Sequence, residues 1–215
     1  MTDQEGPAED RSLASYLSAV ASDEPTPGGG SVVAVCGALS AALAAMVSRL
    51  TMGRADSPTA EDELRSAVGA IDSLRSRFLE LAAADEAAYG RYIDATSMPK
   101  ASDAERSIRR HALQNALIGA AEVPMSVAST CGDLAVHLTA MARLGSHHVL
   151  SDISVATWVG EAALQGAIIN VRANTRLMKD VERRRWYEDE AARVETTVMD
   201  ELRRARDVAA TRVSQ

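Results

Sequence analysis

The sequence predicts an all-α protein, an up-and-down bundle of about six helices, several of them long. Aromatic residues make up only 3% of the chain, whereas apolar residues make up 47% and alanine is abundant. A core of Ala, Leu and Val suits closely packed helices, because β-sheets usually rely on aromatic and β-branched side chains. Apolar residues also recur at a helical period in long segments joined by short connections, which is typical of a bundle.

Helix boundaries follow from turn and capping signals along the chain. Residues 1–10 are expected to be a flexible N-terminus, and residues 11–215 a single helical domain. Ser151 is expected to be the N-cap of the fifth helix, and Pro124 to kink the fourth. The expected helices span residues 11–22, the end of the Pro/Gly run to about 52, 59–95, 102–143, 151–179 and 182–208.

The second expected helix is nearly free of charge between residues 32 and 47, so it needs to be distinguished from a membrane span. It is shorter than the roughly 20 residues that usually cross a bilayer. Gly37, Ala41 and Ala45 recur every four residues. Such ridges of small side chains let neighbouring helix backbones approach closely. We therefore interpret this segment as a buried central helix.

Charge and cysteine usage restrict partners and location. A net charge of −7 argues against a nucleic-acid or anionic-membrane partner. Cys36 and Cys131 lie in apolar helical patterns without CxxC spacing, which favours two free thiols. Residues 1–10 lack the pattern of a secretory signal, so we expect a cytoplasmic protein. No set of His, Cys and carboxylate residues has metal-ligand spacing, so no metal site is expected.

A carboxylate interrupts the apolar stripe of the third helix. Extending that stripe from Leu81 places Asp85 on it, followed by Tyr89 and Tyr92. A buried carboxylate tends to have a raised pKa, which suits a general acid or base near neutral pH. A structural salt bridge or a bond to another helix's backbone is an equally good interpretation.

The fifth helix carries a second polar set. Asp152 and Asn170 are eighteen residues apart, which is five full turns, so both project to the same side, with Asn174 one turn further. They are about 27 Å apart along a straight helix, too far for one small-ligand site within a subunit. They would face each other if two copies of the helix packed antiparallel around a two-fold axis. The equal alternative is that Asp152 complements the helix dipole and the asparagines are core hydrogen-bonders.

The remaining polar residues of this helix form a stripe that we expect to face solvent: Ser154, Thr157, Glu161, Gln165, Arg172 and Arg176. His147 and His148 precede the helix and are more often solvated loop residues than proton shuttles.

The run from Gly28 to Ser31 opens the second helix. Its glycines permit close approach of a ligand, and the free amides at the helix start attract anions. No GK[ST] follows and no strand precedes it, so it is neither a Walker loop nor a dinucleotide fingerprint. Taken alone, a plain helix start is the favoured interpretation.

Taken with its companions, the stretch Pro25-Thr-Pro-Gly-Gly-Gly-Ser31 and the Ala/Gly helix after it resemble the N-terminal signature of the formiminotetrahydrofolate cyclodeaminase and methenyltetrahydrofolate cyclohydrolase family. The resemblance covers about residues 13–180. Further matches follow in chain order: Asp85 and Tyr89, Met98-Pro-Lys100, Ala121-Glu-Val-Pro124, Ser151-Asp152, Glu161 to Ala167, Asn170-Val171 and Asn174.

The resemblance implies a two-fold helical dimer that binds folate near its interface, with a tetrahydrofolate derivative as substrate and no tightly bound cofactor. The implied reaction is cyclisation of 5-formimino-tetrahydrofolate to 5,10-methenyl-tetrahydrofolate with release of ammonia, or hydrolysis of the methenyl form to formyl-tetrahydrofolate. Asp85 and Asp152 are the implied catalytic acid/base residues. The implied substrate-binding residues are Pro27, Gly28, Gly29, Gly30, Ser31, Tyr89, Lys100, Asn170 and Asn174.

Two other functions are compatible with the same residues. One is a family member diverted to another amidine or cyclisation substrate in specialised metabolism. The other is a non-catalytic helical dimer, which would have no reason to keep Asp85, Asp152, Asn170 and Asn174 on inward faces.

Overall fold

The computed structural model describes residues 12–54 and 57–214, so the N-terminus predicted to be flexible, residues 1–10, lies outside the described residues. Within them the chain forms six α-helices and one short 3₁₀ turn, with no strand. The predicted all-α class is therefore confirmed. The elements are α1 (Leu13–Val20), α2 (Gly29–Thr51), α3 (Pro58–Ser97), α4 (Asp103–Leu144), η1 (His147–Val149), α5 (Leu150–Thr175) and α6 (Val181–Val213).

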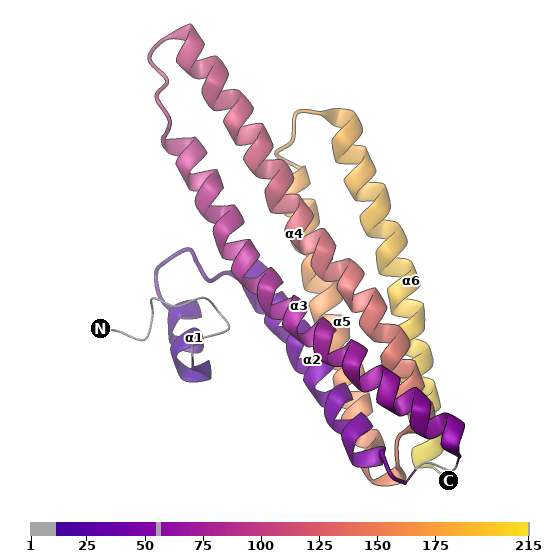
Figure 1. Cartoon of the computed structure of the whole chain (residues 1–215). Coiled ribbons are helices and arrows are strands. Elements are labelled where there is room, and N and C mark those ends of the chain that lie inside the picture. The colour runs from indigo at the N-terminus through magenta and orange to yellow at the C-terminus, as the bar shows by residue number, and fades with distance from the viewer. Residues whose placement is uncertain (1–11, 55–56, 215) are drawn as a thin grey trace.

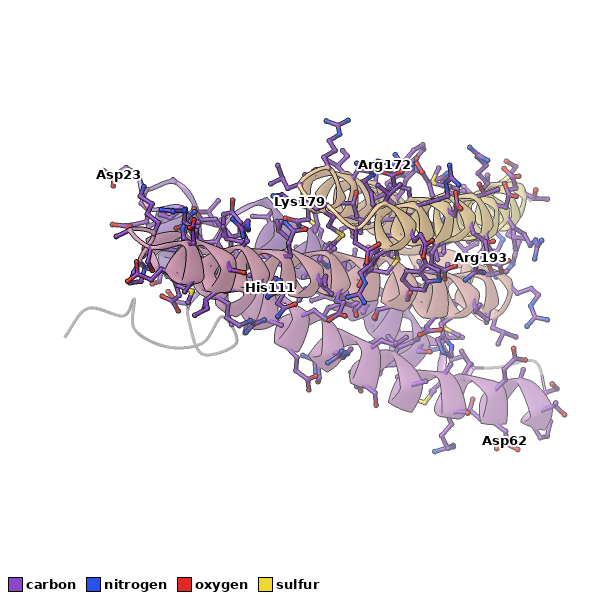
Figure 2. The ribbon with its side chains drawn as sticks, turned by 90° about the horizontal axis from the view of Figure 1, so that it is seen from above. Asp23, Asp62, His111, Arg172, Lys179 and Arg193 are labelled. Atoms are coloured by element: carbon purple, nitrogen blue, oxygen red, sulfur yellow. The ribbon has the colours of Figure 1, made fainter. Side chains whose placement is uncertain are left out.

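The five long helices run side by side in an elongated up-and-down bundle, and the short α1 lies to one side of it (Figure 1). Helix α2 packs against α3, α4 and α5, and α6 covers α4 and α5. Charged side chains project outward around the bundle, among them Asp62, Arg172 and Arg193 (Figure 2).

Helix α2 is the central helix that the sequence predicts. By length and composition it is the one described helix that could cross a membrane, and 56% of its most apolar window is buried inside the bundle. Its small residues allow close contact: a Cβ built on Gly37 would lie 2.4 Å from the ring of Phe78. Its buried Ser40 donates a hydrogen bond to the backbone carbonyl of Ala156 at 2.7 Å.

Side-chain caps define the starts of three of the long helices, α3, α4 and α6. Ser57 accepts a hydrogen bond from the Ala60 amide, and Pro58 occupies the first turn of α3. Ser102 and Glu105 form a reciprocal capping box at the start of α4. Helix α4 continues through Pro124 as one helix from Asp103 to Leu144.

One expectation about the fifth helix is wrong, and another holds only in part. Ser151 is not the N-cap, because the 3₁₀ turn His147–Val149 precedes the helix and α5 begins at Leu150. In the polar stripe, Arg172 and Arg176 are exposed as predicted, whereas Ser154, Glu161 and Gln165 are half-buried. Glu161 pairs with Arg206 and Arg172 with Glu195, while Thr157 is fully buried.

A second exposed face of α5 is apolar. Val155, Trp158 and Ile169 are 51%, 60% and 64% exposed. Leu39 and Met46 of the neighbouring α2 are exposed as well. Several large apolar side chains exposed on neighbouring helices are a feature of interaction sites.

Candidate functional site

A cavity of about 300 Å³ lies where α2 begins, between α3, α4 and the C-terminal half of α5. The segment before α2 contributes Pro25 and Thr26 to its wall. Its polar side chains come from segments far apart in the sequence: Thr26, Asp85, Tyr89, Tyr92, Asn170 and Asn174. The bundle thus brings together most of the polar residues that the sequence marks as candidates.

Asp85 lies directly against the backbone of α2. A Cβ built on Gly30 would be 2.0 Å from Oδ1 of Asp85, so only glycine leaves room for the carboxylate. The backbone N–H of Ser31 donates a hydrogen bond to this carboxylate. The Ser31 amide at the start of α2 therefore binds a carboxylate of the protein itself, and the absence of a side chain at Gly30 makes room for it.

Burial is the main cause that raises the pKa of Asp85 above its ordinary value. The hydrogen bond from Ser31 lowers the pKa, and the neighbouring carboxylate of Glu86 raises it. A carboxyl group with a raised pKa beside a cavity is suited to exchange a proton with a bound ligand, as a general acid or base must.

Asn170 and Asn174 face the cavity from α5, and their amide groups are braced by backbone. The Nδ2 group of Asn174 donates to Ala120 O at 2.8 Å and to Asn170 O at 3.0 Å. Asn170 Nδ2 donates to Gly166 O at 2.9 Å. These bonds fix both side chains with the amide groups turned to backbone, which leaves their oxygens as acceptors for a ligand.

The remaining wall combines two tyrosine rings with aliphatic side chains. Tyr89 and Tyr92 come from α3, Leu117 from α4 and Leu177 from the segment after α5. Flat rings and aliphatic surface with a few polar groups are typical of a pocket for a flat organic ligand. The contribution of Leu117 and Leu177 was not predicted, because nothing in the sequence distinguishes them from core leucines.

Four predicted site residues do not line this cavity. Pro27 and Ser31 are buried behind its wall. Lys100 is exposed in the connection between α3 and α4. Asp152 lies in the first turn of α5, about 27 Å along the axis from Asn170. The separation argued from helix geometry therefore holds within one subunit.

The histidines and cysteines take no part in the cavity. His147 and His148 are exposed in η1, and both cysteines are free, as predicted. In residues 12–54 and 57–214, no group of three or more His, Cys, Asp or Glu side chains could hold a metal ion.

Comparison with known proteins agrees with this architecture. Residues 12–193 match the family model described as formiminotransferase-cyclodeaminase. A methenyltetrahydrofolate cyclohydrolase of Methylorubrum extorquens is 32% identical over 173 residues, which are 80% of this chain and 83% of that protein. The mouse formimidoyltransferase-cyclodeaminase is 34% identical over 80% of this chain, which spans only 32% of the mouse protein.

The fold itself has a solved counterpart. The crystal structure of formiminotetrahydrofolate cyclodeaminase from Thermotoga maritima superposes with a TM-score of 0.85 at 32% identity, covering 94% of this chain and 98% of that one. The resemblance inferred from the proline-glycine run and its companions is therefore confirmed. By its sequence and its fold, this chain belongs to the formiminotransferase-cyclodeaminase family.

Proposed function

We propose that this chain is a folate enzyme that opens or closes the five-membered ring of 5,10-methenyl-tetrahydrofolate. Of the two reactions, we favour hydrolysis of this compound to formyl-tetrahydrofolate. The observation that carries this proposal is Asp85, a carboxyl group with a raised pKa beside a cavity walled by two tyrosines. The cyclohydrolase of Methylorubrum extorquens supports it, because the similarity covers 83% of that protein.

Asp85 has a defined task in the hydrolysis. Water adds to the cationic methenyl carbon, and a base must accept the proton that this water loses. The added hydroxyl then loses its proton to become the formyl carbonyl as the bond from that carbon to N5 breaks, and N5 takes up a proton. A bound cation favours the ionised form of Asp85, so the substrate itself prepares the base. The same carboxylate stabilises the cationic carbon before water attacks.

The second candidate is cyclodeamination of 5-formimino-tetrahydrofolate, which the match to the Thermotoga maritima cyclodeaminase favours. Here N10 attacks the formimino carbon. The bond from that carbon to the formimino nitrogen then breaks, and this nitrogen leaves as ammonia after protonation. The raised pKa of Asp85 favours its protonated form, which can donate the proton that this step requires.

The cavity walls suggest roles for the other predicted residues. The amides of Gly28 and Gly29 and the oxygens of Asn170 and Asn174 suit the polar edge of a pterin, and Tyr89 suits its flat face. Lys100, exposed beyond the cavity, suits an anionic glutamyl tail. We expect no tightly bound cofactor. We also expect a cytoplasmic location, and the two free thiols support this expectation about location.

The proposal is tested by following the near-ultraviolet absorbance of methenyl-tetrahydrofolate with wild-type protein, Asp85→Asn and a control, Asp62→Asn. Asp62 is an exposed carboxylate on the same helix, remote from the cavity. We expect loss of absorbance with wild type and Asp62→Asn only. Gain of the same absorbance from 5-formimino-tetrahydrofolate would identify the second activity. Neither reaction, with no folate binding by calorimetry, would favour a diverted substrate.

We further infer that two copies dock through the apolar face of α5 and α2. The stripe of α5 residues centred on Ala162 is exposed, and Val155 and Ile169 lie symmetrically about it. A two-fold axis there sets the two α5 helices antiparallel. Asp152 and Asn170 share one edge of this stripe, so Asp152 of one copy would then stand beside Asn170 of the other.

Mixing two inactive variants tests this shared site. In a heterodimer of Asp85→Asn and Asp152→Asn protomers, one site loses both carboxylates and the other keeps both. Random reassociation should therefore restore about a quarter of wild-type activity. A stable monomer by analytical ultracentrifugation, or no recovery after mixing, would contradict the inference.

A further inference from the structure

Behind Asp85, three side chains from three helices form a hydrogen-bonded chain that the proposed chemistry does not use. The hydroxyl of Tyr16 on α1 lies 3.0 Å from Oγ of Ser31 on α2. Ser31 Oγ donates to Oε1 of Glu86 on α3 at 3.4 Å. The backbone N–H of the same Ser31 donates to Asp85. One residue therefore connects Tyr16 and Glu86 to the carboxylate at the cavity.

The donors in this chain point toward Glu86. A serine hydroxyl has one proton, so when Ser31 donates it to Glu86 its oxygen accepts the proton of Tyr16. Bonds aligned in this way polarise one another and stabilise a negative charge at the end of the chain. Burial raises the pKa of Tyr16, which therefore remains protonated as a donor. Ser31 is fully buried and Tyr16 is 5% exposed.

Few other titratable groups lie near Asp85. Tyr89 and Tyr92 share its cavity, and Cys36 on α2 contributes to the raised pKa of Tyr16. The residues that α4 and α5 contribute to the cavity carry no charge, and no described lining residue is Lys, Arg or His. Glu86 is therefore the charged neighbour through which Asp85 can be tuned.

The same bond holds the cavity wall in place. Tyr16 is the buried residue of α1, and the segment that follows α1 supplies Pro25 and Thr26 to the cavity. This segment is joined to α2 at one end, and at the other Tyr16 attaches it to Ser31. Tyr16 thus connects the outlying helix to the residues around Asp85.

We propose that Tyr16 is a positioning residue that acts through Ser31 and Glu86 to hold Asp85 and to set when it gains or loses its proton. The catalytic meaning of this inference rests on the proposed function, because that function assigns Asp85 its task. The chain itself is a property of the free protein and can be tested without a substrate.

The variants remove one member at a time. Tyr16→Phe keeps the ring and deletes the hydroxyl, Ser31→Ala keeps the backbone N–H to Asp85, and Glu86→Gln removes the charge. Tyr187→Phe is the matched control, because Tyr187 of α6 is also 5% exposed and its hydroxyl also donates a hydrogen bond, in this case directly to Glu122 of α4. Thermal unfolding of each variant identifies any loss of fold.

The direct readout is the ¹³C resonance of the Asp85 carboxyl in aspartate-labelled protein, titrated with pH and assigned by its loss in Asp85→Asn. We expect the midpoint to fall in Glu86→Gln, because a like charge is removed. In Tyr16→Phe and Ser31→Ala it should rise by a smaller amount, because the charge of Glu86 loses hydrogen bonds that compensate it and acts more strongly on Asp85. The double variant Tyr16→Phe/Ser31→Ala should match Ser31→Ala alone, since both act through one hydroxyl. Tyr187→Phe should leave the midpoint unchanged.

Activity then reports on catalysis. We expect kcat/KM to fall about threefold to tenfold in Tyr16→Phe, as for loss of one hydrogen bond, with the pH profile displaced in the same direction as the resonance. A shifted resonance without turnover of either folate would overturn the proposed function but would still support the hydrogen-bonded chain from Tyr16 to Glu86. An unchanged Asp85 midpoint in Tyr16→Phe and Ser31→Ala would overturn the inference, whatever the activity. If Tyr16→Phe fails to fold, Ser31→Ala decides the question.

Discussion

Helices α2 and α3 meet twice at a glycine, and the two contacts have opposite characters. At Gly30 the space that a Cβ would fill is occupied by the carboxylate of Asp85, at 2.0 Å. At Gly37 it is occupied by the ring of Phe78, at 2.4 Å. The contacts are seven residues apart on both helices, which is about two turns. The same pair of helices therefore uses the same packing arrangement twice, a glycine of α2 that makes room for a side chain of α3.

The surroundings decide what each contact does. Phe78 is fully buried in the hydrophobic core, where its ring gains dispersion contacts with the small residues of α2. Asp85 lies at the edge of the cavity, where burial raises its pKa. Close approach of two backbones therefore produces a rigid core at one level and a perturbed carboxyl group two turns away.

The comparison is sharpened most by Asp85→Asn. Loss of a general acid or base typically lowers the rate by about 10²- to 10⁴-fold. Unfolding should nevertheless be unaffected or require slightly more free energy at neutral pH, because the buried charge is removed. Steady-state kinetics and thermal unfolding of the same preparation measure both. Full activity in Asp85→Asn would show that the contact between Gly30 and Asp85 is structural, like the contact between Gly37 and Phe78.

The converse change is Phe78→Ala. Truncating a buried Phe usually lowers the free energy of unfolding by about 3–5 kcal/mol, through lost transfer energy and a cavity. Because Asp85 lies two turns away, the folded fraction should keep a near-normal turnover rate. Urea unfolding and activity per folded molecule test this, and Phe78→Leu should show a smaller loss of stability.

Alanine at each glycine tests whether the two contacts are equally rigid. At Gly37 the added methyl meets a ring enclosed on all sides, so unfolding should require about 1–3 kcal/mol less. At Gly30 the carboxylate can move into the cavity, so we expect a smaller loss of stability with a large loss of activity. Equal losses of stability in urea would mean that Asp85 is held as tightly as Phe78.

The smallest expected effect is on the pH dependence of stability. A raised folded pKa means that the native state binds the Asp85 proton more tightly than the unfolded state. The resulting stabilisation is complete below the unfolded pKa and is lost as pH rises through the folded pKa. As pH rises from the unfolded pKa, about 4, through the folded pKa, wild type should therefore lose stability relative to Asp85→Asn. Parallel denaturant midpoints at all pH values would contradict this.

The long helices and several site residues could be predicted because they depend on local patterns. Period 3.6 places Leu81 and Asp85 on one inward face of α3, and α3 does bury that face. Small residues every four positions identified α2 as the central helix. Asn170 and Asn174 followed from the same periodicity, and both reach the cavity.

The errors concern contacts between helices. A stripe of Glu and Arg on α5 looks solvated, but charges of α6 pair with it, and the face left open carries Trp158 and Ile169. Ser31 was assigned to the ligand from its motif, whereas its hydroxyl is turned to Tyr16 and Glu86. Tyr16 was not singled out, because a lone Tyr on a short helix has no local signal.

The sequence by itself determined the helices, the small-residue ridge of α2 and the membership of the family, because periodicity and ordered motifs are local properties of the chain. Only the tertiary structure decided that charges of α6 pair with the polar stripe, that Gly30 receives Asp85 and that Tyr16 reaches it through Ser31. The physical reason is that a helical repeat specifies which residues share a face. It does not specify which neighbour packs there, and that neighbour sets the burial, the hydrogen bonds and the pKa.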